Sequence, residues 1–363
     1  MNRMFRILAA GCVGALAGAA FAAAQMAPLT ISETGSTLIY PLFQSWVAAY
    51  AKSDPNLHIR VGATGSGAGI SQAIAGRVQI GTSDAYMSDG QAMANPNILN
   101  IPLAISAQTV DVNIPELHGG TLKLSGPVLA GIYSGRIRMW DDEQIAAMNQ
   151  GVGLPHRAIV PVRRAEGSGD TFIFTQFLSF SDDTGPDSDS DPNAWGNKTG
   201  YGTTVSWPSV SGEREATGNE GMVQTIARTP YAVGYVGASF ETDAAKAGLT
   251  VAMLQNQDGK FLLPNAETIS AAAAALTPRT PPDERLTLVF APGEDSYPLI
   301  NYEYAIVARK QPTQQAATEI GNFLLWCISP QGGSAPGFLE PVHFIALPTP
   351  IRARSEIQIA KIQ

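Results

Sequence analysis

Cysteine and histidine are scarce in this sequence, with two and four residues among 363. No histidine has a second histidine or a cysteine at metal-site spacing, so no zinc site and no other metal cofactor is expected. Charged residues make up only 15% of the chain, and the acidic ones are in excess, which gives a net charge of −8. An acidic chain without a basic run is a poor candidate for nucleic-acid binding.

Sequence motifs of common enzyme classes are also missing. The chain has no G-x-S-x-G elbow and no G-x-G-x-x-G fingerprint, and its glycine-rich stretch at 62–69 is not followed by Lys and Ser or Thr. These gaps argue against an α/β-hydrolase, a dinucleotide-binding protein and a P-loop nucleotidase. We therefore expect a protein that is not an enzyme.

The only apolar run long enough to consider as a membrane span lies at the start of the chain. Arg3 and Arg6 precede an uncharged stretch at 8–21, and small residues follow at 22–24. This pattern predicts a signal peptide over 1–24 and export to the periplasm. One alternative is an uncleaved anchor, although the run is short and rich in Ala and Gly. Another is a lipid anchor on Cys12, which ends a lipobox-like stretch with Ala9 where a large aliphatic residue is usual.

Cys327 is the single cysteine that remains once such a signal is removed. An intramolecular disulfide is then excluded, even though the exported compartment is oxidising. The residue lies in the apolar run 323–328, which is typical of a small side chain in a core.

Segments with strand and helix patterns alternate along the chain, which predicts an α/β fold whose sheets are covered on both faces. Strand patterns occur at 29–32, 57–62, 78–81, 101–114, 158–162 and 231–236. Helix patterns occur at 38–51, 70–75, 129–133, 142–148, 171–179, 223–227 and 270–276.

Loops of Gly, Ser, Thr and Asp recur between a strand and a helix, at 34–37, 64–69, 81–84 and 167–171. Helix N-termini present unpaired N–H groups and the positive end of the helix dipole. One such loop alone indicates only a helix cap, but four of them, with Arg164 just before the last, predict a bound oxyanion.

An acidic loop at 182–191 places aspartates two residues apart, as calcium loops do. It lacks the glycine and the final glutamate of an EF-hand loop. The alternatives are therefore a calcium site and a solvated surface insertion.

The loops together resemble the periplasmic phosphate-binding protein of the high-affinity phosphate ABC transporter. The resemblance runs from about residue 29 to about 347 and is carried by the stretches 34–41, 65–69, 81–85, 133–141, 163–172, 218–222 and 234–237. The part after residue 218, with Phe-Leu-Leu-Pro at 261–264, is most similar to the mycobacterial, antigenic branch of that family.

This resemblance implies a two-lobed type II binding protein with a hinge and a central anion-binding cleft. It implies a first lobe from residues 25–110 and 299–363 and a second from 111–298. The segments 101–112 and 299–307 are the expected crossovers between them. The implied partners are inorganic phosphate and a membrane permease, and a monomer is expected.

The family's phosphate ligands are carried over to matching positions of this chain. They are Thr37, Leu38, Ser66, Asp84, Arg164, Ser168, Gly169 and Asp170. Glu166 stands where the family usually has Asp, in a salt bridge to the arginine. In this scheme Asp84 accepts the proton of phosphate, and sulfate, which has no such proton, is rejected.

Asp170 departs from the many family members that have Thr there, although the mycobacterial branch also carries Asp. Its carboxylate adds an acceptor or a repulsive charge, so we expect phosphate affinity to hold or improve as pH falls. Replacing Asp170 with Thr should flatten that pH dependence. Glu166, one methylene longer than Asp, alters the detail of the pairing with Arg164.

The resemblance favours a transport receptor that binds phosphate, closes and docks on a permease. The alternatives on the same fold are a phosphate sensor or surface protein, and an enzyme acting on phosphate esters. An enzyme of that kind needs an activated nucleophile or metals, and the sequence offers neither.

Overall fold

The computed structural model of the chain describes residues 28–182 and 193–363. The predicted signal peptide, Cys12 and the acidic segment beyond Asp182 lie outside these residues. Within the described ranges, no helix combines the length and the apolar character needed to cross a membrane.

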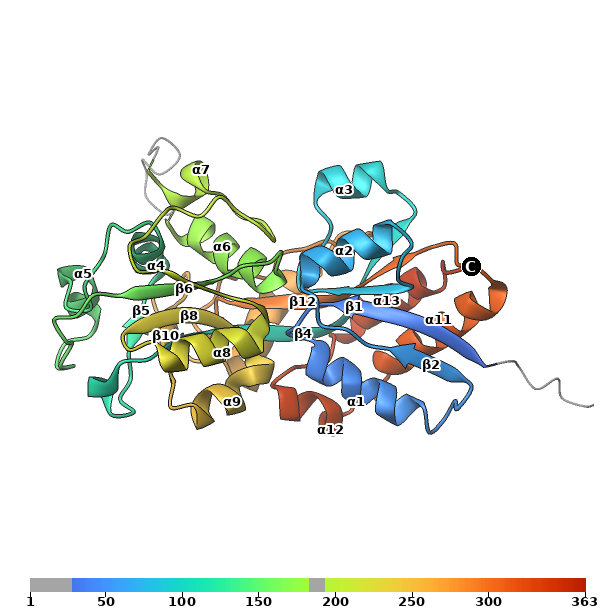
Figure 1. Cartoon of the computed structure of the whole chain (residues 1–363). Helices are drawn as coiled ribbons and strands as arrows, with labels where there is room; N and C mark the ends of the chain where they lie inside the picture. The colour runs from blue at the N-terminus through green and yellow to red at the C-terminus, as the bar shows by residue number, and fades with distance from the viewer. Residues whose placement is uncertain (1–27, 183–192) are drawn as a thin grey trace, which may run out of the picture.

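A nine-stranded mixed sheet runs through both halves of the described part of the molecule (Figure 1). Its order is β2-β1-β3-β12-β4-β8-β6-β7, with β9 also paired to β4. The strands are β1 (Leu29–Gly35), β2 (Leu57–Arg60), β3 (Ile80–Ser83), β4 (Ile98–Val112), β6 (Val160–Arg164), β7 (Arg214–Ala216), β8 (Ala232–Gly237), β9 (Thr250–Val251) and β12 (Ile300–Ala308). The described parts of the chain confirm the predicted mixed α/β class.

The long strand β4 belongs to both halves of this sheet. Residues 98–107 of β4 pair antiparallel with β12, and residues 108–112 pair antiparallel with β8. We call the part built on β1, β2, β3 and β12 the first lobe and the part built on β6, β7 and β8 the second lobe. β4 therefore carries the chain across the lobe boundary without interruption.

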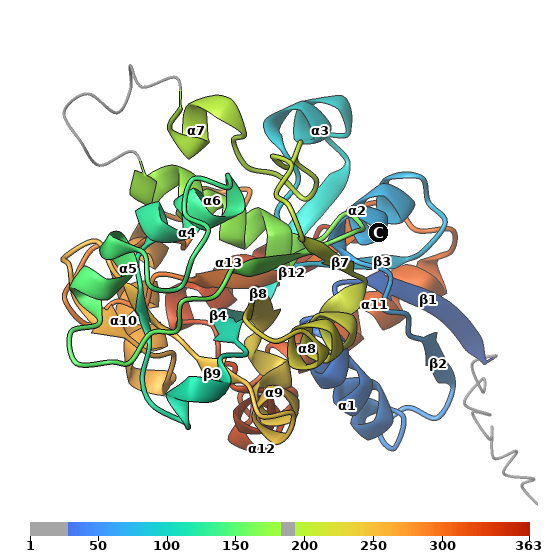
Figure 2. The same cartoon turned by 60° about the vertical axis from the view of Figure 1, so that its left-hand side comes forward.

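Helices cover both faces of the sheet in each lobe, which explains why β3 and β8 are buried along their full length. In the first lobe, α2 and α3 lie on one face and α1 on the other (Figure 1). In both views α1 and α8 lie side by side across the lobe boundary (Figure 2). The helices are α1 (Tyr40–Tyr50), α2 (Ser66–Ile74), α3 (Asp89–Ala94), α4 (Gly126–Tyr133), α5 (Glu143–Met148), α6 (Gly169–Asp182), α7 (Trp195–Lys198), α8 (Gly218–Arg228), α9 (Glu241–Lys246), α10 (Ala266–Leu276), α11 (Gln314–Cys327), α12 (Pro336–Leu339) and α13 (Thr349–Ile359).

Smaller elements complete the described chain. A three-stranded sheet joins β5 (Lys123–Leu124), β10 (Met253–Gln255) and β11 (Phe261–Leu262) at the outer end of the second lobe. Short 3-10 turns occupy Pro115–Leu117, Ala238–Phe240, Thr277–Arg279 and Glu340–Val342.

Cys327 is a fully buried free thiol at the end of α11. Burial raises the pKa of this thiol well above its ordinary value, so it stays neutral. Nearby, Trp46 of α1 donates its indole N–H to the carbonyl of Gly333 at 2.8 Å. The prediction of a core cysteine is confirmed.

Five helices begin earlier than their apolar patterns predict. α4 begins at Gly126 instead of residue 129 and α10 at Ala266 instead of 270. The other three begin at the cleft. α2 begins at Ser66 instead of residue 70, α6 at Gly169 instead of 171, and α8 at Gly218 instead of 223. Their first turns consist largely of Gly, Ser and Asn, which have low helix propensity and carry no apolar signal. The starts of α2 and α6 are therefore parts of the loops that the sequence marks as anion-binding candidates, and the start of α8 lies in the stretch 218–222 that carries the family resemblance.

Candidate functional site

The four Gly-, Ser- and Thr-rich loops meet where the two lobes face each other. The first three follow β1, precede α2 and follow β3, and β1 runs parallel to β3 in the first lobe. The fourth precedes α6 in the second lobe. The helix starts of α2 and α6 thus point into one cleft from opposite sides, as the loop pattern predicts.

Glycines allow the backbones of the two lobes to touch in this cleft. The N–H of Gly67 donates to the carbonyl of Gly167 at 3.0 Å. A Cβ on Gly169 would lie only 2.4 Å from Asp84 Oδ2 and 2.5 Å from Ser66 Oγ. The structure therefore has its lobes closed, and a side chain at position 169 would hold them apart.

Asp84 lies buried at the floor of the closed cleft, directly after β3. Its Oδ1 accepts a short hydrogen bond from Ser36 Oγ, and its Oδ2 accepts one from Ser66 Oγ at 3.1 Å. Ser66 Oγ in turn accepts the N–H of Asp84 at 3.1 Å. Burial, together with the charge of Asp170, raises the pKa of Asp84 to about 6. The hydroxyl hydrogen bonds to both of its oxygens work against this rise and favour the anionic form.

Arg164 ends β6 and is buried on the opposite side of the cleft. Its Nη1 lies 2.5 Å from Asp170 Oδ2, its Nε donates to Glu166 Oε1 at 2.8 Å, and its Nη2 donates to Thr37 Oγ1 at 3.2 Å. Burial works to lower the pKa of Arg164, but Asp170 and Glu166 outweigh it, so the pKa is raised. The guanidinium stays charged and is compensated by two carboxylates.

Glu166 forms the salt bridge to Arg164 that the sequence predicts. Its Oε1 also accepts the N–H of Gly218 at 2.9 Å, so the side chain ties α8 to β6. Burial works to raise the pKa of Glu166, but the bond to Arg164 outweighs it, and the pKa is lowered.

Asp170 is fully buried in the first turn of α6. Besides Arg164, its Oδ2 accepts from Asn219 Nδ2 at 2.9 Å, and its Oδ1 accepts from Gln108 Nε2 at 3.1 Å. Three donors from three elements therefore hold this carboxylate. Its side chain serves as the counter-ion of Arg164 in this closed state.

Thr37 connects the first lobe to this network. Its Oγ1 accepts from Arg164 Nη2 and from Asn219, whose Nδ2 lies 3.0 Å away and whose N–H lies 3.3 Å away. With its oxygen serving as acceptor, the hydroxyl hydrogen of Thr37 is available to donate to an anion.

Two predicted N–H donors have protein partners in the closed state. The N–H of Leu38 donates to Ser36 Oγ at 3.0 Å, and the N–H of Ser168 donates to the carbonyl of Thr203 at 2.8 Å. The hydroxyl of Ser168 caps α6 by accepting the N–H of Thr171 at 3.3 Å. These contacts place both residues at the cleft and occupy the groups that the prediction assigns to an anion.

Sequence reasoning missed three polar residues of the site, Ser36, Gln108 and Asn219. Ser36 and Asn219 lie inside stretches that carry the family resemblance, so their signal was present. Gln108 lies within an apolar strand pattern, where only its polarity marks it. All three are buried and hydrogen-bonded to Asp84 or Asp170.

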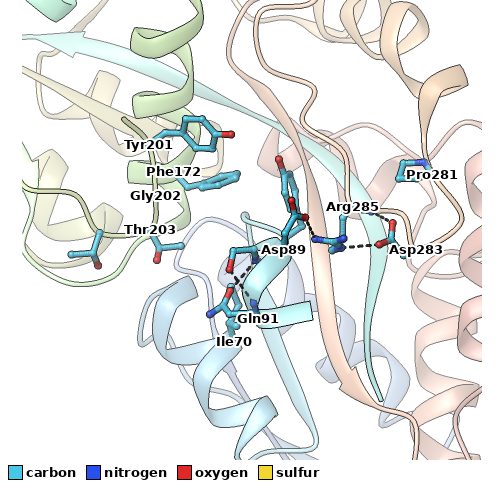
Figure 3. Close-up of a pocket in the computed structure, with 13 residues that line it drawn as sticks. Ile70, Asp89, Gln91, Phe172, Tyr201, Gly202, Thr203, Pro281, Asp283 and Arg285 are labelled. Atoms are coloured by element: carbon cyan, nitrogen blue, oxygen red, sulfur yellow. Dashed lines mark hydrogen bonds and ion pairs between the residues drawn. The ribbon is translucent and has the colours of Figure 1, made fainter. Parts of the chain in front are cut away.

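A cavity lies beside this cluster and is lined by none of its residues (Figure 3). It measures about 760 Å³. Phe172 and Tyr201 line one side, and Arg285 lies on the other in ion pairs with Asp89 and Asp283 at 2.7 and 2.8 Å. The polar residues of the anion cluster hydrogen bond to one another across the closed cleft.

No metal site accompanies the cluster in the part of the chain that the structure describes, since no group of three or more His, Cys, Asp or Glu side chains is placed to hold an ion. The acidic loop at 182–191 lies almost wholly outside that part, so its calcium alternative stays a prediction. The cluster offers hydroxyl and N–H donors, one balanced guanidinium and a buried acceptor. Such a set can hold a protonated oxyanion.

Two lobes joined by a shared strand, with a polar cluster enclosed between them, define a two-lobed type II binding protein. Comparison with known proteins agrees. A family model described as a PBP superfamily domain matches residues 22–331. A high affinity periplasmic phosphate-binding protein, PfluDING, solved with bound phosphate, superposes with a TM-score of 0.69 over 90% of this chain and 92% of that one, at 21% identity.

Sequence relatives narrow the assignment. The phosphate-binding protein PstS of Methanocaldococcus jannaschii is 33% identical over 357 residues, which cover 93% of this chain and 88% of that protein. The phosphate-binding protein PstS3 of Mycobacterium bovis is 28% identical over 339 residues, covering 90% and 84%. The chain belongs to the PBP superfamily and, within it, to the family of the phosphate-binding protein PstS.

Proposed function

We propose that this protein captures inorganic phosphate between its lobes and delivers it to the permease of an ABC transporter. The relatives that match 90% or more of the chain are named phosphate-binding proteins. The observation that carries the proposal is Asp84, a buried carboxylate surrounded by hydroxyl donors at the floor of a closed anion cleft.

Asp84 accounts for selectivity. Phosphate keeps at least one proton near neutral pH and can donate it to Asp84, whereas sulfate meets the carboxylate with a bare oxygen. A site built around a hydrogen bond can reject the analogue that lacks it by about 10⁴–10⁵. The rejection arises because the buried acceptor is left without a partner and faces a like charge.

The ligand set that we propose remains the predicted one. It comprises Thr37, Leu38, Ser66, Asp84, Arg164, Ser168, Gly169 and Asp170, with Glu166 orienting Arg164. Donors that now serve protein partners, such as Ser66 Oγ, would turn to phosphate when it binds. Because Arg164 is already neutralised by Glu166 and Asp170, most binding strength comes from hydrogen bonds instead of net charge.

The lobe boundaries also remain a proposal, with one adjustment. Residues 280–286 hydrogen bond to the first lobe, since the carbonyl of Pro282 accepts from Gln358 Nε2 at 2.6 Å and Arg285 Nη1 donates to the carbonyl of Met87 at 3.1 Å. We assign this segment to the first lobe and leave the rest of 111–298 in the second.

We further propose that the protein is exported to the periplasm, works as a monomer and does not turn over its ligand. The apolar segment before residue 24 supports export, with cleavage near Ala24 or lipidation at Cys12 as the two routes. The absence of hydrolysis is checked with a chromogenic phosphomonoester, for which we expect no product.

Titration calorimetry of the ligand-stripped mature chain tests the function directly. Phosphate should bind at micromolar or tighter Kd, and sulfate should give no heat. Failure to bind either anion would overturn the proposal. Sulfate binding as tight as that of phosphate would overturn the role of Asp84.

A further inference from the structure

A second carboxyl group lies directly against Asp84. Glu303 on β12 is fully buried. β12 pairs antiparallel with β3 so that Tyr304 is opposite Ser83. Asn301, two residues before Glu303 on the same strand, joins the two residues, because its Nδ2 donates to the carbonyl of Asp84 at 3.0 Å and to Glu303 Oε1 at 3.2 Å. Each of the two carboxyl groups also shifts the pKa of the other, so they lie close together.

The two oxygens of Glu303 have unequal surroundings. Oε1 accepts from Ser106 Oγ at 2.5 Å and from Asn301 Nδ2 at 3.2 Å. Oε2 is buried and has no donor beside it. A buried carboxylate oxygen without a donor is costly, whereas a protonated oxygen can itself donate. The surroundings of Glu303 therefore suit a neutral acid with its proton on Oε2.

The surroundings of Asp84 suit the opposite state. Both of its oxygens accept hydroxyl hydrogen bonds, from Ser36 and Ser66. Two carboxyl groups in contact cannot both be ionised at low cost. Burial raises the pKa of Glu303 well above its usual range, while the pKa of Asp84 reaches only about 6. Asp170, on α6, is the other charged group that acts on Asp84.

We propose that Glu303 is a positioning residue for phosphate recognition, which stays protonated and donates a hydrogen bond to Asp84. The inference rests on the proposed function. The donated bond holds the Asp84 carboxyl in place and favours its anionic form. Asp84 then has an acceptor position left for the proton of phosphate. The two buried carboxyl groups can thus lie close together because Glu303 holds the proton and only Asp84 carries a charge.

Three variants separate this role from packing. Glu303→Gln keeps a neutral donor towards Asp84 and an acceptor towards Ser106. Glu303→Met keeps the approximate volume and removes the donor. Glu33→Gln is the matched control, because Glu33 is also buried, accepts a hydroxyl bond from Thr82 at 2.6 Å, and is not among the groups that act on Asp84.

Phosphate and sulfate titrations of each variant from pH 5 to 8 give the first readout. We expect Glu303→Gln and Glu33→Gln to stay within about threefold of the unmodified protein with the same pH profile. Glu303→Met should lose about ten- to a hundredfold in phosphate affinity, the effect of one hydrogen bond to a charged group. The midpoint of the pH dependence of its phosphate affinity should lie at a higher pH than in the unmodified protein. The ratio of its phosphate affinity to its sulfate affinity should be smaller.

Two results would overturn the inference. Tighter phosphate binding by Glu303→Gln, with the pH profile moved to lower pH, would mean that Glu303 is ionised and repels Asp84. An unchanged profile in Glu303→Met would mean that Glu303 only fills space.

Carbon-13 NMR of the side-chain carboxyls in anion-free protein gives a readout that needs no phosphate. We expect the Glu303 carboxyl to stay protonated through pH 8 and the Asp84 titration to move upward in Glu303→Met. Ionisation of Glu303 below pH 7 would overturn the inference. If the NMR titrations agree with these expectations but phosphate does not bind, the proposed function is wrong, and the inference that Glu303 is protonated beside Asp84 is still supported.

Discussion

Ser106 and Gln108 lie two residues apart on one face of β4, and each holds a different acidic group of the cleft. Ser106 Oγ donates to Glu303, the neighbour of Asp84, and Gln108 Nε2 donates to Asp170. Ser106 pairs with β12 of the first lobe, whereas Gln108 pairs with β8 of the second. The two residues that donate to these carboxyl groups therefore lie on either side of the lobe boundary.

Asp84→Asn should weaken discrimination against sulfate more than any other single change in the cleft. The amide is neutral and can donate, so sulfate no longer faces an unpaired buried acceptor. We expect the ratio of phosphate to sulfate affinity to fall about a hundredfold or more, measured by calorimetry at pH 7. Asp89→Asn, on the exposed helix α3, is the control and should leave the ratio unchanged. A preserved ratio in Asp84→Asn would contradict the selectivity argument.

Arg164→Met should abolish phosphate binding and destabilise the protein. The change leaves the buried carboxylate of Asp170 without its counter-ion, which costs about 3–5 kcal/mol in the free energy of unfolding. Urea unfolding measures this cost. The double variant Arg164→Met with Asp170→Asn should recover part of it, because the uncompensated charge is gone. Additive losses in the double variant would mean that the two side chains act independently.

Gly169→Ala should hold the lobes apart. The added Cβ would lie 2.4 Å from Asp84 Oδ2 and 2.6 Å from Asp84 Cβ, so closure requires Asp84 or the start of α6 to shift. Overpacking of this kind costs about 1–3 kcal/mol, which corresponds to about a ten- to hundredfold loss of phosphate affinity. Small-angle X-ray scattering in the presence of phosphate should give a larger radius of gyration for Gly169→Ala than for the unmodified protein.

Gly90→Ala is the matched control for this change. A Cβ on Gly90 would meet no atom within 4 Å, so affinity and radius should not change. Equal effects of the two substitutions would show that the close approach of Gly169 to Asp84 does not cause the loss of phosphate affinity.

Glu33→Gln should flatten the pH dependence of stability. Burial raises the pKa of Glu33 to about 8 from an ordinary 4.5, so the folded protein keeps a proton that the unfolded chain releases. Stability therefore falls as pH rises from about 4.5 to 8. The variant cannot ionise and should be more stable than the unmodified protein at pH 8, on the order of 3 kcal/mol, with little difference at pH 4.

Urea unfolding across this pH range checks the prediction. Asp111 and Glu284 also have raised pKa values, about 7 and about 8, so some pH dependence should persist in the variant. The same loss of stability with pH in both proteins would contradict the assignment to Glu33.

The sequence predicts the fold class and the convergence of the cleft loops because both leave local signals. The spacing of apolar residues predicts β1, α1 and β4, and the Gly- and Ser-rich loops indicate where α2 and α6 begin. The pairing of Glu303 with Asp84 leaves none, since it depends on the register of two strands more than 200 residues apart in the chain. Glu303 lies in an otherwise apolar strand pattern, so its place beside the cleft follows only from the register of the sheet.

The positions of the helix starts could not be predicted for a related reason. Gly218 and Asn219 lack apolar character, so periodicity finds α8 only from residue 223. Yet Asn219 donates to both Thr37 and Asp170. The polar residues that line the cleft thus also form the first turns of these helices, where apolar periodicity cannot detect the helix start.

The double neutralisation of Arg164 also bears on the medium in which the protein works. Charge attraction between a receptor and its ligand weakens as salt screens it. Here the only guanidinium of the described cleft cluster is matched by Glu166 and Asp170. Capture that depends on aligned hydrogen bonds in a closed cleft is largely insensitive to ionic strength, so phosphate uptake should persist whether the surroundings are dilute or saline.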